Sequence, residues 1–145
     1  MNTSRSQSLP PTAFVWTVRV YYEDTDAAGV VYYANYLRFM ERARTEWLRS
    51  LGFEQTTLAH QHDRVFVVRA LAIEFLRPAL FNDLLETAVE PVDVRGGLIE
   101  IAQTIRRGTH TLVTANVKIA CVNTRSFKPA RIPQPIVDKI AMRHA

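Results

Sequence analysis

The chain has 145 residues, enough for one domain with a real hydrophobic core but few for two. Hydrophobic residues make up 48% and charged residues 22%, which is ordinary for a globular fold. The formal net charge of +4 suits an anionic ligand, although charge alone does not identify it. No apolar run reaches the roughly 18 residues that a membrane-spanning helix needs, so no integral membrane segment is expected.

The first thirteen residues, MNTSRSQSLPPTA, are polar and lack the apolar segment of a secretory signal peptide. We expect residues 1–13 to be a flexible tail and residues 14–145 to form a single domain. The one cysteine, Cys121, excludes an internal disulfide and falls in an apolar strand pattern, which favours a buried structural thiol. These features are compatible with a reducing compartment, and we expect a cytoplasmic protein.

A strand and a long helix are predicted in the first third of the chain. Residues 14–23, FVWTVRVYYE, are rich in β-branched and aromatic side chains and predict a strand. The segment 24–29, DTDAAG, then forms a loop that leads into a helix over about 35–51. Apolar residues recur in that helix at spacings of three and four. They are Tyr36, Met40, Ala43, Trp47 and Leu51. Asn35 is a candidate N-cap, with a first turn that begins earlier, near Tyr33, as the alternative. Gly52 stands where a left-handed C-terminal cap is usual.

The rest of the chain is predicted to be mostly strand. The predicted strands cover 64–75, 85–94, 98–106 and 112–122. Residues 95–97 and 107–109 are typical of hairpin turns, and a short helix is predicted over 136–143. His60 and His62 fall in a segment expected to be a polar loop.

Two of these strands alternate strictly between apolar and polar residues. On one side lie Ile99, Ile101 and Ile105, and likewise Val113, Ala115, Val117, Ile119 and Cys121. On the other lie Glu100, Thr104 and Arg106, and likewise Asn116 and Lys118. Such alternation predicts an antiparallel sheet with one face on a core. The order, a strand, a long helix and four strands in hairpin succession, predicts an α+β domain in which a curved sheet wraps one central helix.

Asp26 is the residue whose position suggests chemistry. It lies just before a glycine turn and the start of the long helix, where unpaired N–H groups carry roughly half a positive charge. Such a helix start can bind a carbonyl oxygen as it becomes an oxyanion, and a nearby carboxylate can attack the carbonyl or activate water. Most aspartates before a glycine, however, only cap a turn. The residues alone leave both interpretations open for Asp26, and Asp24 is expected to be a turn residue.

Other kinds of site have weaker support. The four histidines are scattered, and nothing near His60 and His62 supplies further ligands, so no metal site is expected. There is no glycine-rich phosphate loop and no serine nucleophile elbow. The basic residues form no stripe along one element, which argues against a nucleic-acid partner.

The stretch YYEDTDAAGVVYYANYLRFMERARTEWL resembles the signature of the hot-dog-fold acyl-CoA thioesterases. It is most similar to the 4-hydroxybenzoyl-CoA thioesterase-like branch and to the YbgC subfamily, which is associated with the Tol-Pal system. The resemblance covers about residues 18–123, and its core, Asp-x-Asp-x-x-Gly-x-Val-Tyr, is specific.

The resemblance implies a fold like the one predicted above, assembled as homodimers and often homotetramers, with a metal-free active site at the subunit interface. It implies that Asp26 is the nucleophile or general base and that the backbone N–H of Tyr33 polarises the thioester carbonyl. Many YbgC-like members carry histidine where this chain has Tyr33, a substitution that keeps the backbone donor. Gly29 and Val30 are expected to contact the substrate.

The family binds the phosphates of coenzyme A with basic residues near strand ends, and Arg106 and Arg107 are the candidates here. The expected function is hydrolysis of an acyl-CoA thioester to free acid and coenzyme A, with no cofactor beyond the substrate's own coenzyme A. Two alternatives stay open. One is a non-catalytic domain that binds an acyl group or a partner, and the other is a hydratase or dehydratase. Those last relatives usually carry a histidine at the site, and this stretch has none.

Overall fold

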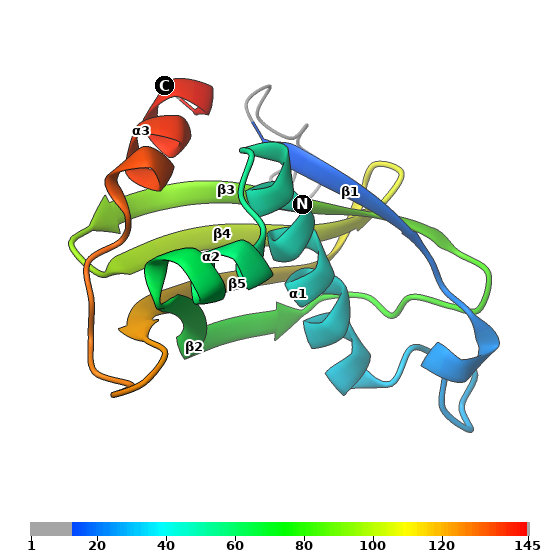
Figure 1. Cartoon of the computed structure of the whole chain (residues 1–145). Coiled ribbons are helices and arrows are strands. Elements are labelled where there is room, and N and C mark those ends of the chain that lie inside the picture. Colours follow the sequence, from blue (N-terminus) through cyan, green and yellow to red (C-terminus); the bar gives the residue numbers. More distant parts are fainter. Residues whose placement is uncertain (1–12, 145) are drawn as a thin grey trace.

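The computed structural model describes residues 13–144, in which five strands form one antiparallel sheet in the order β1-β3-β4-β5-β2. The strands are β1 (Phe14–Arg19), β2 (Arg64–Phe75), β3 (Leu84–Arg95), β4 (Leu98–Arg107) and β5 (His110–Asn123). The sheet curves around the long helix α1 (Tyr33–Ser50), as Figure 1 shows. This confirms the predicted α+β architecture. The predicted tail lies almost wholly outside the described residues.

The core lies between α1 and the concave face of the sheet. The buried residues of α1 recur at helical spacing, and the apolar residues of the strands alternate as predicted. From α1 they are Tyr36, Phe39, Met40, Ala43, Trp47 and Leu48. Facing them are Leu85, Val89, Ile99, Ile101, Ile105, Val113 and Val117. Burying a side chain of this size contributes about 1.5–3 kcal/mol, so this interface holds the helix on the sheet.

The predicted first strand is too long. β1 ends at Arg19, and a 3-10 helix, η2 (Tyr22–Asp24), follows it. The backbone N–H of Tyr21 donates to Asp24 Oδ2 at 2.8 Å, and the N–H of Asp24 donates to the carbonyl of Tyr21 at 2.9 Å. Because the carboxylate of Asp24 offers the backbone a local hydrogen bond, the chain turns where β propensity alone predicts a strand.

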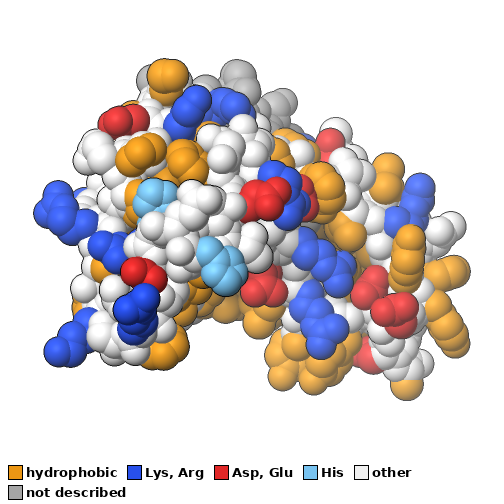
Figure 2. Space-filling view, in the orientation of Figure 1, with side chains coloured by type: hydrophobic (Ala, Val, Ile, Leu, Met, Phe, Trp, Pro, Cys, Tyr) orange, Lys and Arg blue, Asp and Glu red, His pale blue; other side chains and the backbone are white. Residues whose placement is uncertain are grey.

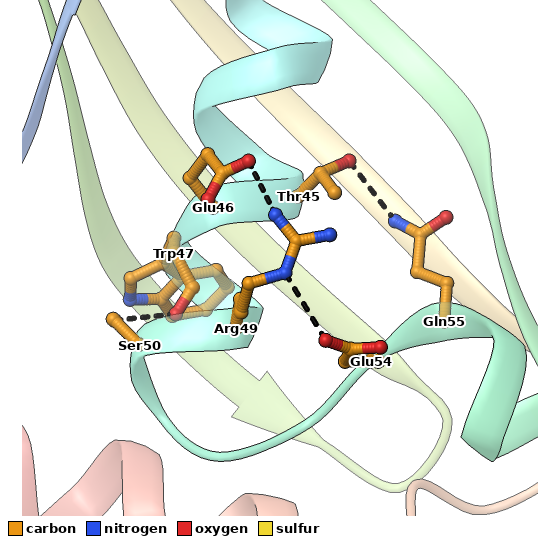
Figure 3. A network of polar contacts seen from close by, with 7 residues as sticks. All are labelled: Thr45, Glu46, Trp47, Arg49, Ser50, Glu54 and Gln55. Atoms are coloured by element: carbon orange, nitrogen blue, oxygen red, sulfur yellow. Dashed lines mark hydrogen bonds and ion pairs between the residues drawn. The ribbon is translucent and has the colours of Figure 1, made fainter.

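A second helix, α2 (Gln55–His62), stands where a polar loop was predicted, so that prediction was wrong. Leu58 is its one buried residue, which explains why no apolar periodicity marks it. A polar network joins its start to the end of α1 (Figure 3). In that network Arg49 forms ion pairs with Glu46 and Glu54, and Gln55 Nε2 donates to Thr45 Oγ1 at 3.3 Å.

The four later strands are not all in hairpin succession, which corrects a second prediction. β3, β4 and β5 are consecutive neighbours, but β2 pairs with β5 and forms one edge of the sheet. Strands that follow one another in the chain often pair in the sheet, but not always. Apolar alternation shows which face of a strand is buried, but it does not show which strand is its partner. No partner strand lies along the outer side of β2 in the part of the chain that the structure describes.

The C-terminal helix α3 (Gln134–Arg143) begins two residues before its predicted start and packs near the end of α1. Trp47 Nε1 donates to His144 Nε2 at 3.0 Å, just beyond α3. Cys121 is buried, as predicted, and burial raises the pKa of its thiol. Within residues 13–144, no helix is both long and apolar enough to cross a membrane.

Candidate active site

The loop between η2 and α1 is organised by Asp24. Its Oδ2 accepts from the backbone of Tyr21, and its carbonyl accepts from the N–H of Tyr32 at 2.9 Å and from Asn35 Nδ2 at 3.1 Å. Asp24 therefore ties the segment after β1 to the start of α1, which confirms the prediction that it is a turn residue.

Asp26 occupies the next turn. Its N–H donates to the carbonyl of Val30 at 2.9 Å, and its carbonyl accepts from the N–H of Gly29 at 3.0 Å. Gly29 has φ +82°, a conformation that a residue with a side chain rarely adopts. One carboxylate oxygen of Asp26, Oδ1, accepts from the N–H of Ala28 at 2.9 Å. The other accepts no hydrogen bond from any described residue, and the side chain is exposed.

The first turn of α1 is open. Tyr32 is the N-cap residue, and its side chain makes no capping hydrogen bond. The alternative start near Tyr33 is confirmed, and the prediction of Asn35 as N-cap is wrong. Asn35 lies in the third position of the helix, from which its amide reaches back to Asp24. Helix geometry gives the N–H of Tyr33 no intrahelical acceptor, and no other described group accepts from it. This N–H is therefore available to an oxygen of a ligand.

The segment after β2 forms the other wall of the site. The carbonyl of Ala79 accepts from the N–H of Val31 at 2.9 Å, and the N–H of Ala79 donates to the hydroxyl of Tyr36 at 2.9 Å. A cavity of about 260 Å³ lies between this segment and the helix start. Its lining consists of Val31, Tyr33, Tyr36, Phe75, Leu76, Arg77 and Pro78. The cavity thus adjoins Tyr33, whose backbone N–H has no acceptor among the described residues.

The pKa of Tyr36 is raised, chiefly because the side chain is buried. The hydrogen bond from Ala79 and the positive charge of Arg107 oppose this rise, whereas the carboxylates of Asp83 and Asp26 add to it. Asp26, Asp83 and Arg107 are therefore close enough to the hydroxyl of Tyr36 to act on it electrostatically. Sequence reasoning treated Tyr36 only as a core residue, because its spacing in the helix carries no sign of this polar contact.

Arg106 and Arg107 lie on opposite faces of β4, because consecutive strand residues alternate. Arg106 stands across from Glu86 of β3, on the face away from α1. It is only 6% exposed, and its Nε has no hydrogen-bond partner. Arg107 lies on the side of the site and pairs with Asp83 at 2.6 Å. The structure therefore does not bring the two candidate phosphate contacts together.

Exposed apolar side chains gather at the end of the molecule that carries η2 (Figure 2). Among them Tyr22 and Phe81 meet edge to face, with ring centroids 5.8 Å apart. Val30, predicted to contact substrate, forms a β-bridge with Leu80 in this region and is half-buried. The site loop is thus fixed on one side by the segment that follows β2.

Comparison with known proteins identifies the family of the chain. The family model described as the thioesterase superfamily matches residues 28–114, which include the helix start and both arginines of β4. The chain belongs to the thioesterase superfamily. An acyl-CoA thioesterase YbgC of Haemophilus influenzae is 47% identical over 131 residues, which cover 90% of this chain and 95% of that protein. The resemblance to the YbgC thioesterases is confirmed, and the protein is a thioester hydrolase of that superfamily.

Solved structures of thioesterases share the fold. A probable thioesterase from Bartonella henselae is 42% identical, with a TM-score of 0.81 and coverage of 83% of this chain and 99% of that one. A 1,4-dihydroxy-2-naphthoyl-CoA thioesterase from Synechocystis is 25% identical, with a TM-score of 0.83 and coverage of 89% and 96%. The predicted hot-dog fold is therefore confirmed.

Proposed function

We propose that this thioesterase hydrolyses acyl-CoA to a free acid and coenzyme A, with Asp26 as nucleophile or general base. The observation that carries the proposal is that one loop holds both a carboxylate with an unengaged oxygen, on Asp26, and an open helix start, at Tyr33. The Haemophilus influenzae relative, whose name states acyl-CoA thioesterase activity, supports the choice of substrate.

In this mechanism the thioester carbonyl oxygen accepts a hydrogen bond from the N–H of Tyr33 and becomes an oxyanion as the carbonyl carbon is attacked. If Asp26 attacks directly, the C–S bond breaks, coenzyme A leaves and takes up a proton, and water hydrolyses the resulting anhydride. If Asp26 acts as a base, it takes a proton from the attacking water, and the C–S bond breaks in the same way. Loss of one oxyanion donor typically lowers kcat by about 10²–10³.

The site is proposed to be completed by a second copy of the chain, in a homodimer or homotetramer. β2 is an edge strand of twelve residues whose exposed apolar side chains would be covered by such pairing. They are Val67, Val68, Leu71 and Phe75, with Leu37 of α1 beside them. Phe75 also lines the cavity next to Tyr33, so an assembly through this edge would enclose the substrate. The proposed compartment is the cytoplasm, where Cys121 would stay reduced.

The test is release of free thiol from short, long and aromatic acyl-CoAs by the purified protein and by its Asp26→Asn variant. We expect turnover by the wild type and a loss of at least about 10³-fold in the variant, because the amide can neither attack nor accept a proton. Near-normal hydrolysis by Asp26→Asn would refute the role of Asp26. Binding of acyl-CoA without thiol release would favour a non-catalytic domain, and hydration or dehydration of the acyl chain would favour the hydratase alternative.

A further inference from the structure

Two cavities lie in the groove between α1 and the edge strand β2, with volumes of about 270 and 280 Å³. Three residues line both of them, Glu41 and Arg44 of α1 and Val68 of β2. The two charged side chains therefore lie at the level of Val68, along the strand that has no outer partner among the described residues. This groove shares no lining residue with the cavity beside Tyr33.

Arg44 is a half-buried cation without a counter-ion in its own chain. Among the described residues no carboxylate, that of Glu41 included, lies within ion-pair distance of its guanidinium. The pKa of Arg44 is lowered, chiefly because burial disfavours the charged form, and the negative charge of Glu41 opposes this shift. Because arginine keeps its proton in proteins, the cost of burying this charge is offset only by a partner.

Gln103 of β4 holds this guanidinium in place. Arg44 Nη1 donates to Gln103 Oε1 at 2.9 Å, and Gln103 Nε2 donates to the carbonyl of Met40 at 3.1 Å. Gln103 is only 1% exposed, so a polar residue within the core positions the arginine. A guanidinium has five N–H donors, and those that Gln103 does not engage remain for a carboxylate.

Glu41 places the opposite charge on the same groove. Its side chain is exposed and forms no ion pair with a described residue. Residues three apart in a helix lie on one face, so Glu41 and Arg44 both project toward the groove. Such a surface is self-complementary, because a second copy related by a twofold axis presents its guanidinium to the carboxylate and its carboxylate to the guanidinium.

Antiparallel pairing of β2 with β2 of a second copy would produce this arrangement. The twofold axis of such a pair is perpendicular to the sheet, so both α1 helices lie on the same face and run antiparallel. With that axis near Val68, Glu41 of one copy lies opposite Arg44 of the partner subunit. The exposed apolar side chains of Leu37, Val68 and Leu71 would be covered at the same time.

We infer that the groove between α1 and β2 binds a second copy of the chain through two symmetric ion pairs, each between Arg44 and Glu41 of the partner subunit. The inference rests on the proposed assembly through β2 and adds the residues that set its register, with Val68 near the twofold axis. Charge complementarity favours a second copy as the occupant, because a small anion bound to Arg44 would leave Glu41 unpaired.

The test uses two charge reversals, Glu41→Arg and Arg44→Glu, and follows assembly by sedimentation equilibrium. Each variant alone places like charges opposite each other in both pairs. A hydrogen bond to a charged group contributes about 10- to 100-fold, so the two pairs together predict a loss of affinity of at least about 100-fold.

An equimolar mixture of the two variants should assemble as the wild type does. In the mixed dimer both pairs again join an arginine to a glutamate, one pair from each end of the exchange. Within each variant chain positions 41 and 44 carry the same charge, so an interaction inside one chain cannot produce this rescue. A mixture that stays dissociated although both variants are folded overturns the inference.

Arg42→Glu is the matched control, because Arg42 is an exposed arginine of α1 that lines neither cavity. It changes the net charge by the same amount as Arg44→Glu. We expect it to assemble as the wild type does and to rescue a fluorescently labelled Glu41→Arg chain less well, because one of the two pairs still joins two arginines. Equal rescue by Arg42→Glu and Arg44→Glu would show that net charge alone drives association and would overturn the inference.

Glu41→Gln provides the measurement if Arg44→Glu does not fold, because Glu41 is exposed and its replacement leaves the bond from Arg44 to Gln103 in place. It should weaken assembly by about 10- to 100-fold for each pair lost. Unchanged assembly of Glu41→Gln overturns the inference while the proposed assembly through β2 stands. A monomeric wild type overturns both and leaves the groove to another ligand, and thiol release from acyl-CoA by that monomer would leave the proposed hydrolysis intact.

Discussion

The hydroxyl of Tyr36 on α1 accepts a 2.9 Å hydrogen bond from the backbone N–H of Ala79. The two residues are 43 positions apart, and the bond is buried. The carbonyl of Ala79 holds Val31 in turn, so a single phenol links the central helix, the segment after β2 and the loop that carries Asp26. This contact fixes the position of the helix start relative to the proposed catalytic carboxylate.

Tyr36→Phe should therefore destabilise the protein more than its small change in size suggests. It leaves the N–H of Ala79 buried without its acceptor, which costs about 1–3 kcal/mol. Urea unfolding measures the loss, and thiol release should fall as the site loop loosens. Tyr33→Phe is the control, because the side chain of Tyr33 is 62% exposed and its ring is kept. Equal stability of the two variants would contradict the structural role of the Tyr36 hydroxyl.

The same hydroxyl should make stability depend on alkaline pH. Burial raises the pKa of Tyr36 above the ordinary value of 10.0, so the folded state holds this proton at a pH where the unfolded chain has lost it. The contribution is complete below 10.0 and is lost as the pH rises through the folded-state pKa. Free energies of unfolding, measured from neutral pH to above 10.0, should fall less steeply in Tyr36→Phe than in the wild type. Parallel curves would show that Tyr36 is not the group responsible.

Asp24 and Asp26 should separate stability from activity. Asp24→Ala removes the acceptor of the Tyr21 N–H, and loss of a comparable helix cap costs about 0.5–2 kcal/mol. Thiol release by the folded fraction should persist. Asp26→Asn keeps the shape of its turn, so unfolding should change little while turnover is lost. If Asp24→Ala abolished turnover in fully folded protein, the roles assigned to the two carboxylates would have to be exchanged.

Helices, strands and turn residues could be predicted from the sequence, whereas contacts between distant segments could not. The apolar spacing of α1 and the alternation of β4 and β5 predicted those elements within two residues, because each buries one face on a common core. Asp24 was predictable as a turn residue because its bonds are local. The pairing of β2 with β5 and the bond from Ala79 to Tyr36 join residues far apart in the chain, and no local pattern encodes them.

The same limit applies to the candidate site. The sequence singled out Asp26 and Tyr33, which the fold places at the two ends of one short loop. It also treated Arg106 and Arg107 as a pair, although strand alternation separates them. The cavity beside Tyr33 arises only when the end of β2 packs beside the start of α1, and no local pattern in the sequence encodes that contact.

Gly97 should be intolerant of even one added methyl group. A Cβ there would lie 2.4 Å from the carbonyl oxygen of Ala130, in a segment bonded to the β3–β4 turn through Ile132 and Gly96. Gly97→Ala must displace that segment, at a cost of about 1–3 kcal/mol for overpacking. Gly96→Ala is the control, because its Cβ would meet nothing within 4 Å and only its positive φ opposes it. A larger loss of stability for Gly96→Ala would show that the segment around Ala130 moves freely.

Val68 tests the proposed assembly through the edge of β2. Its side chain is 51% exposed, on a strand with no partner along its outer side among the described residues. Val92 of β3 is 56% exposed and serves as the matched control position.

A carboxylate buried in an interface loses its hydration without gaining a partner, so Val68→Asp should dissociate the assembly and Val92→Asp should not. Sedimentation equilibrium should then give a monomer for Val68→Asp, and thiol release should fall with dissociation because Phe75, on the same strand, lines the cavity beside Tyr33. A dimeric and active Val68→Asp would place the subunit interface elsewhere.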